Sequence, residues 1–130
     1  MAGTILLDLD TILNAPKFFA LFALVERAAG RRIIVVDGDS KRKDGEKLAA
    51  GLGISLHRYV QCLDIKDKKS RHEAKTTVAR SLRDKAPVIW IDLDLGDWAG
   101  EDLSKLSNII TLNWAAVLTQ GVSTEGAASA

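Results

Sequence analysis

Short apolar runs alternate with segments of helical periodicity from one end of the chain to the other. The apolar runs predict strands at residues 4–9, 32–36, 87–92 and 108–112, with a weaker strand within residues 54–63. Helices are predicted between Asn14 and Gly30 and over residues 41–52, 70–82 and 101–106, because spacing and composition there favour them. A last helical turn is predicted at residues 114–118.

The predicted helix after the first strand has clear end signals. Asn14 can cap it, Pro16 falls in the first turn, where a missing backbone N–H costs little, and Gly30 can end it. Apolar residues at helical spacing predict the face that packs on the sheet, and these residues are Phe18, Leu21, Phe22, Val25 and Ala28.

Strands that alternate with helices of 10–15 residues predict right-handed βαβ units and a mostly parallel sheet. We therefore expect an α/β fold, namely a Rossmann-like three-layer sandwich around a five-stranded sheet. The 130 residues suit one domain, which we expect to cover residues 1–120. Residues 121–130 are small and polar, and this composition predicts a flexible tail.

Composition and charge indicate where the protein is located and which partners are not favoured. Apolar residues make up 47% of the chain, which is enough for a core, and the net charge of +1 does not favour nucleic acid or an anionic membrane. The one cysteine, Cys62, excludes an internal disulfide, suits a reducing cytosol and predicts a buried thiol. No apolar run approaches the ~20 residues of a membrane span, and the start of the chain lacks a signal-peptide pattern. These features predict a cytoplasmic protein without membrane contact.

Carboxylates gather where the first and fourth predicted strands end. Asp8 and Asp10 lie two apart, and residues two apart on a strand share a face, so both are expected to point to one site. The fourth strand ends at Asp92 and Asp94, with Asp97 close behind. If these strands are neighbours, the acids converge at the carboxyl edge of the sheet, where ligands bind in open α/β folds. Clustered carboxylates repel one another, and Mg²⁺ favours such hard oxygens, so a Mg²⁺ site is predicted.

The end of the second strand and one later lysine are further candidates. Asp37 and Asp39 could join the acidic cluster or open a tight turn, and Ser40 could bind a phosphate oxygen or cap the next helix. Lys75 could neutralise a phosphoryl group and keep the first aspartate ionised. The run Lys41-Arg42-Lys43 is expected to be a solvated surface. The pattern GxxxxGK[ST] is absent and neither histidine has a partner at metal-ligand spacing, so neither a P-loop nor a zinc site is indicated.

Three segments together indicate a family. They are Leu7-Asp8-Leu9-Asp10-Thr11-Ile12, Lys75 ahead of the fourth strand, and Trp90-Ile91-Asp92-Leu93-Asp94 with Gly96-Asp97. In this combination the chain resembles the haloacid dehalogenase (HAD) superfamily, whose first motif is an apolar run followed by DxDx(T/V/I) and whose fourth motif is acidic. The likeness is closest to small capless members and covers nearly the whole chain.

The resemblance implies phosphoryl transfer from a phosphorylated substrate, small or macromolecular. Asp8 would be the nucleophile that forms an aspartyl-phosphate, and Asp10 would act as general acid and then as general base. Asp8, the backbone carbonyl of Asp10, and Asp92 or Asp94 would hold Mg²⁺, and Lys75 would brace the phosphate. There is little sequence for a cap domain, so the site would be open to large substrates.

Two departures from the family pattern bear on activity. Thr11 stands where the family has glycine. Asp37-Gly38-Asp39 occupies the region where the second strand normally ends in a phosphate-binding Thr or Ser, and a carboxylate there would repel a phosphate dianion. Either Ser40 takes that role with a shifted register, or phosphatase activity is lost.

Two alternatives fit the same layout. A PIN- or NYN-type ribonuclease would use Asp8, Glu73, Asp94 and Asp97 to hold metal for RNA hydrolysis. A binding module without catalysis, either ParA-like without the P-loop or a degenerate HAD-like domain, would act through a partner instead.

Overall fold

The computed structural model describes residues 3–38, 42–54, 56–62, 67–93, 95 and 107–118. The elements in chain order are β1 (Thr4–Asp8), α1 (Leu9–Asn14), α2 (Pro16–Ala28), β2 (Arg32–Asp37), α3 (Gly45–Gly51), β3 (Arg58–Gln61), α4 (Lys68–Arg83), β4 (Val88–Asp92) and β5 (Ile109–Asn113). A helical turn follows at residues 114–118, as the sequence predicts.

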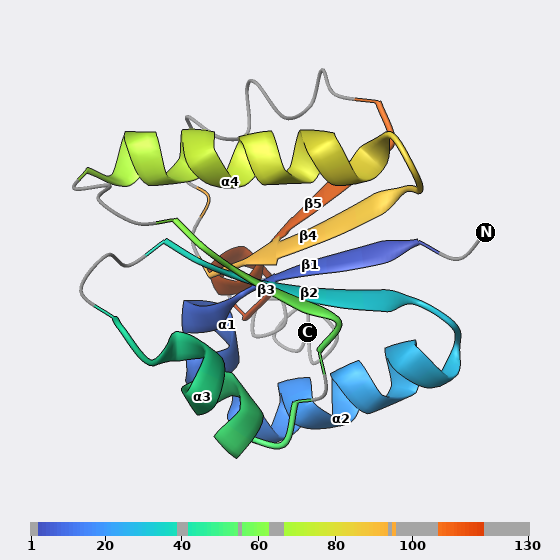
Figure 1. Ribbon diagram of the computed structural model, residues 1–130, viewed down its shortest axis with the longest axis vertical. Helices are drawn as coiled ribbons and strands as arrows, with labels where there is room; N and C mark the ends of the chain where they lie inside the picture. Colours follow the sequence, from blue (N-terminus) through green and yellow to red (C-terminus); the bar gives the residue numbers. More distant parts are fainter. Residues whose placement is uncertain are drawn as a thin grey trace, which may run out of the picture.

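The five strands form one sheet in the order β3-β2-β1-β4-β5, and all four pairings are parallel. Helix α4 covers one face of this sheet, and α1, α2 and α3 lie on the other (Figure 1). The three-layer α/β fold, with a Rossmann-like arrangement, is therefore confirmed. β1 is apolar between Thr4 and Asp8 and buried along its whole length, as expected for a central strand covered on both faces.

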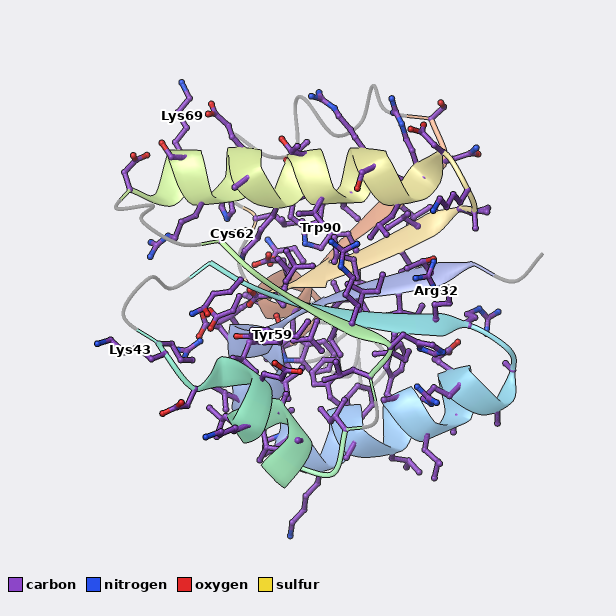
Figure 2. All side chains as sticks on the ribbon, in the orientation of Figure 1. Arg32, Lys43, Tyr59, Cys62, Lys69 and Trp90 are labelled. Atoms are coloured by element: carbon purple, nitrogen blue, oxygen red, sulfur yellow. The ribbon has the colours of Figure 1, made fainter. Side chains whose placement is uncertain are left out.

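Side-chain alternation along the strands divides the core into two layers. Leu6 and Trp90 point to the α4 side, where Figure 2 shows Trp90 and Cys62 between that helix and the sheet. Ile5 and Leu7 point to the opposite side and pack with residues of α1 and α2. The prediction that Cys62 is buried is confirmed, and Trp90 is fully buried as well.

The segment after β1 differs from the sequence prediction. The strand ends at Asp8 rather than at residue 9, and α1 begins at once with Leu9. A second helix, α2, starts at Pro16 and matches the helix predicted between Asn14 and Gly30, whereas α1 is an additional helix that was not predicted. Ala15 separates them with φ −144° and ψ 69°, because the ring of a proline keeps the residue before it out of the helical conformation.

The predicted buried face of α2 is also wrong in part. Phe19 and Ala23 are the buried residues of α2, whereas Phe18, Leu21 and Val25 are 50%, 62% and 56% exposed. Apolar residues occur all around this helix, so periodicity alone cannot say which stripe faces the sheet. Phe18 and Phe19 both contact the ring of Trp114 after β5, with centroids 5.2 and 4.9 Å away.

Other predicted boundaries are close to the observed ones. α4 begins two residues earlier and ends one residue later than the sequence predicts. α3 and β3 are shorter than predicted. The predicted helix at residues 101–106 and the tail at 121–130 lie outside the described residues. Within the part of the chain that the structure describes, no helix is both long and apolar enough to cross a membrane.

Candidate active site at the carboxyl edge of the sheet

The strand order creates a switch point between β1 and β4. The chain runs from β1 outward to β2 and β3, and then returns to place β4 on the other side of β1. In open α/β sheets, ligands bind outside the carboxyl ends of the strands at such a point. Asp8 and Asp92 are the last residues of β1 and β4, so both lie at the switch point.

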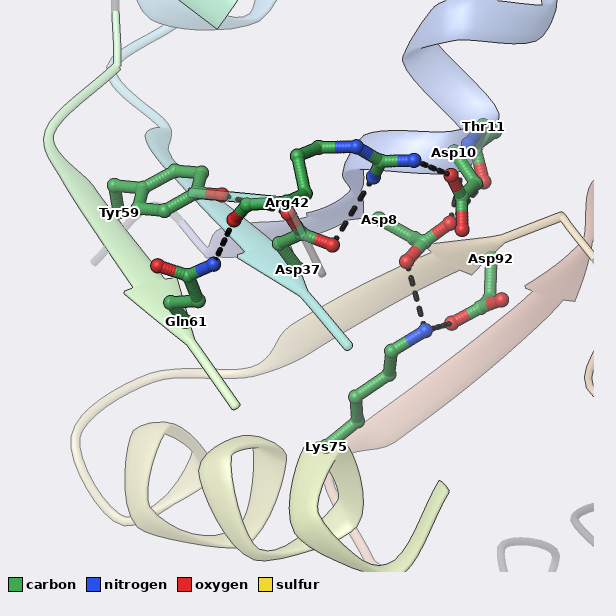
Figure 3. Close-up of polar contacts among 9 residues, drawn as sticks. All are labelled: Asp8, Asp10, Thr11, Asp37, Arg42, Tyr59, Gln61, Lys75 and Asp92. Atoms are coloured by element: carbon green, nitrogen blue, oxygen red, sulfur yellow. Dashed lines mark hydrogen bonds and ion pairs between the residues drawn. The ribbon is translucent and has the colours of Figure 1, made fainter. Parts of the chain in front are cut away.

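Lys75 joins these two carboxylates. It extends from α4, and its Nζ donates to Asp8 Oδ1 at 2.7 Å and to Asp92 Oδ2 at 2.9 Å (Figure 3). All three residues are buried, with 1%, 6% and 3% of Asp8, Lys75 and Asp92 exposed. Two carboxylates against one ammonium leave an excess negative charge when all three are ionised.

Burial and the Asp92 carboxylate raise the pKa of Asp8 to about 6, although the Lys75 ammonium opposes the change. Burial by itself would lower the pKa of Lys75, but the two carboxylates outweigh it, and the net shift is upward. At neutral pH the lysine is therefore protonated and most of Asp8 is ionised. The site combines an ionised, desolvated carboxylate with a fixed cation.

The second oxygen of Asp8 is held by the start of α1. Thr11 donates to Asp8 Oδ2 through its backbone N–H at 3.1 Å and its hydroxyl at 3.3 Å, so Asp8 is the N-cap of that helix. Thr11 is thus a direct partner of Asp8, whereas the sequence marked it only as a departure from a glycine. On the other strand, Trp90 Nε1 lies 3.3 Å from Asp92 Oδ2 and donates to it.

Asp10 is not part of β1, so the prediction that strand alternation places it on the same face as Asp8 is wrong. The chain becomes helical at Leu9, and strand alternation therefore does not extend to Asp10, which lies in the first turn of α1. Its carboxylate instead accepts a hydrogen bond from Arg42 Nη2 at 2.8 Å (Figure 3). Arg42 Nη1 also donates to Asp37 Oδ1 at 3.1 Å, so one guanidinium links the two acids.

Asp37 lies apart from the Asp8–Asp92 pair. Alternation along β2 sends its side chain to the face opposite α4, where Tyr59 donates its hydroxyl to Asp37 Oδ2 at 2.9 Å. The next residue, Gly38, is beside Lys75: a Cβ atom added there would lie 3.0 Å from Lys75 Cε. Arg42 and Tyr59 hold the Asp37 carboxylate on the face opposite α4. Asp37 should therefore repel a phosphate at the Asp8–Asp92 site less than the sequence suggests.

Several predicted site residues lie outside the described residues or away from the site. Outside the described residues are Asp39, Ser40, Asp94 and Asp97. Glu73, an acid of the nuclease alternative, is exposed and occupies the side of α4 opposite buried Lys75. Lys75 thus brings Asp8 and Asp92 together, and Arg42 brings Asp10 and Asp37 together.

The donor atoms at this edge bear on the Mg²⁺ site that the sequence predicts. Among the described residues there is no group of three His, Cys, Asp or Glu side chains that could hold a metal. Asp8 and Asp92 nevertheless supply carboxylate oxygens, and Asn113 of β5 adds a buried Oδ1 with no hydrogen-bond partner. These are the hard oxygen donors that Mg²⁺ prefers, so their chemistry fits the ion.

Sequence reasoning missed four residues of this edge. Arg42 was expected on a solvated surface, yet it links Asp10 to Asp37, and Gln61 Nε2 donates to the backbone carbonyl of Arg42. Tyr59 lies inside a weak strand with no motif around it. Asn113 carried the same signal as Asp92, a polar residue that ends an apolar strand, and could have been found by it.

No protein-family model, curated protein or solved structure matches this chain. Membership of the HAD superfamily therefore stays a prediction that rests on the residues themselves.

Proposed function

We propose that this chain is a Mg²⁺-dependent phosphohydrolase of HAD type that works through an aspartyl-phosphate on Asp8. The observation that carries the proposal is the buried cluster of Asp8, Lys75 and Asp92 at the switch point of the sheet. Two acids and one lysine from three separate elements are costly to bury, so a catalytic role explains them better than a structural one.

In the first step, an oxygen of the Asp8 carboxylate attacks phosphorus while the bond from phosphorus to the leaving oxygen breaks. The pKa of about 6 leaves Asp8 largely ionised at neutral pH, as a nucleophile must be. Thr11 and Lys75 fix the orientation of its two oxygens before substrate arrives. Lys75 also presents a fixed positive charge to the transferring phosphoryl group.

In the second step, water attacks the phosphorus of the aspartyl-phosphate, which releases phosphate and regenerates the Asp8 carboxylate. Asp10 is the proposed proton carrier: it protonates the leaving oxygen first and accepts a proton from the water later. Its side chain is 44% exposed, which suits a group that exchanges protons with solvent between the steps. Arg42 positions Asp10 at the rim of the sheet.

Bound Mg²⁺ would neutralise the charge that develops on the phosphoryl oxygens. The residues that would hold the ion are Asp8, Asp92 and the backbone carbonyl of Asp10. The excess negative charge of the two carboxylates over Lys75 supports a cation at this place.

The test compares wild type with Asp8→Asn, using p-nitrophenyl phosphate and Mg²⁺. Turnover is expected to fall by about a thousandfold or more, because an amide cannot act as the nucleophile. Asp44→Asn is the matched control, since Asp44 is exposed and should be replaceable without loss of activity. Beryllium fluoride should form a stable adduct with the wild type and not with Asp8→Asn.

Unchanged turnover in Asp8→Asn would remove this residue as the nucleophile. RNA cleavage without phosphatase turnover would favour the nuclease instead. A protein that binds no Mg²⁺ and turns over neither substrate would be the binding module.

A further inference from the structure

Asn113 has a polar atom that nothing in the described chain satisfies. This residue ends β5, and its Oδ1 is buried without a hydrogen-bond partner, the one such side-chain atom among the described residues. Native proteins satisfy nearly all buried acceptors, and an exception at the edge where ligands bind marks a place that a water molecule or an ion can fill.

The strand register places this atom at the site. Asn113 pairs with Asp92, and partners in neighbouring parallel strands point to the same face, so both lie on the α4 side of the sheet. Leu7 pairs with Ile91, which sets Asp8 opposite Asp92 one residue further along. Asp8, Asp92 and Asn113 therefore form a row of three oxygen-bearing side chains across β1, β4 and β5.

The charges in this row decide what could satisfy Asn113 Oδ1. Asp8 and Asp92 carry two negative charges, and Lys75 balances one of them. The remaining excess is negative, so a cation is favoured beside Asp92. Lys75 and Trp90 both donate to Asp92 Oδ2, whereas Asp92 Oδ1 has no contact among the described residues. That oxygen and Asn113 Oδ1 thus belong to paired residues on one face of the sheet, and neither accepts a hydrogen bond from a described residue.

We infer that Asn113 is a further ligand of the divalent cation, binding it through its side-chain oxygen beside Asp92. The inference rests on the Mg²⁺ of the proposed function and extends it to a third strand. Amide oxygens are accepted ligands of hard cations, although they carry no charge. Asn113 thereby raises cation affinity without adding to the repulsion between the two buried carboxylates.

The test measures Mg²⁺ affinity by calorimetry, with Mn²⁺ binding followed by electron paramagnetic resonance as a second readout. Asn113→Ala is expected to bind about tenfold more weakly than wild type or worse. Asn113→Asp, which keeps an oxygen at this position, should retain the affinity or raise it. Asn14→Ala is the matched control, because it removes the same group from an exposed residue that contacts Trp114 on the opposite face.

The outcomes separate this inference from the proposed function. Equal affinity in wild type and Asn113→Ala, with binding lost in Asp92→Asn, overturns the role of Asn113 and leaves the phosphohydrolase intact. Weaker binding in Asn113→Asp than in Asn113→Ala also overturns it. Affinity that depends on Asn113, in a protein without phosphatase turnover, supports the ligand and overturns the phosphohydrolase. A wild type that binds neither ion overturns both.

Discussion

Lys75 Nζ lies 2.7 Å from Asp8 Oδ1, although 67 residues separate the two in the sequence. β1 delivers the carboxylate to the face of the sheet that α4 covers, and Lys75 reaches it from α4 on that same side (Figure 3). β4 lies beside β1 and adds Asp92 to the same cation. One ion cluster therefore ties the crossover helix to both central strands at the edge where ligands bind.

Lys75→Met should destabilise the fold strongly. It removes the cation between two buried carboxylates, and breaking a buried ion pair in this way typically costs about 3–5 kcal/mol. The free energy of unfolding, measured with urea at pH 7, should fall by an amount of this order. Lys69→Met is the control, because Lys69 is exposed on α4, as Figure 2 shows, and its loss should change stability by under about 0.5 kcal/mol.

The double variant Lys75→Met with Asp8→Asn checks the cause. In Lys75→Met, the carboxylates of Asp8 and Asp92 have both lost the lysine. The double variant removes the charge of one of them, so it should be more stable than Lys75→Met alone by about 1 kcal/mol or more. If the two substitutions were additive, the loss in Lys75→Met would come from packing of the long side chain rather than from charge.

The pKa of Asp8 predicts how stability depends on pH. It rises from an ordinary 3.8 to about 6 on folding, so the folded chain binds this proton more tightly than the unfolded chain. This contribution to stability is present below pH 4 and is lost as the pH rises through 6, by up to a few kcal/mol. Asp8→Asn lacks this contribution. Between pH 4 and pH 7, the unfolding free energy of wild type should therefore fall relative to that of Asp8→Asn. A difference between the two proteins that stays constant over this range would contradict the pKa.

Much of the fold could be predicted from sequence, and so could the three residues of the ion cluster, Asp8, Lys75 and Asp92. Apolar runs that end in Asp8 and Asp92 define buried parallel strands, and the carboxyl ends of such strands meet at one edge. Lys75 could be nominated from chemistry alone, as a cation near clustered acids. These predictions succeeded because strand period and edge placement follow from local sequence.

The wrong predictions have one physical cause. The direction of a side chain depends on the residue at which one strand or helix ends and the next begins. Asp10 was assigned to the face of Asp8, but a helix begins at Leu9 and changes the period from 2 to 3.6. Arg42 could not be placed because its partners, Asp10 and Asp37, come from two separate elements, α1 and β2. Tertiary contacts of this kind leave no periodic signal in the sequence.

The orientation of α2 can be tested with one pair of substitutions. Phe19→Ala empties a fully buried position and should cost about 3–5 kcal/mol of unfolding free energy. Leu21→Ala changes a side chain on the exposed stripe and should cost under about 0.5 kcal/mol, although Leu21 belongs to the face that spacing predicts as buried. A larger loss for Leu21→Ala than for Phe19→Ala in urea denaturation would mean that the helix packs by its other stripe.

Gly38 should be intolerant of even a methyl group, although the family resemblance would place Thr or Ser in this region. A Cβ atom here lies 3.0 Å from Lys75 Cε and 3.4 Å from Arg71 Cδ, and Lys75 is held by two carboxylates, so it cannot yield without lengthening its ion pairs. Gly38→Ala should therefore lower unfolding free energy by about 1–2 kcal/mol, and kcat/KM for p-nitrophenyl phosphate should fall with it. Gly51→Ala is the control, because nothing lies within 4 Å of its Cβ position, and this change should leave stability equal or raise it by about 0.5–1 kcal/mol. If Gly38→Ala matched Gly51→Ala in both stability and turnover, Lys75 would have room to move, and its contacts with Asp8 and Asp92 would be looser than their lengths indicate.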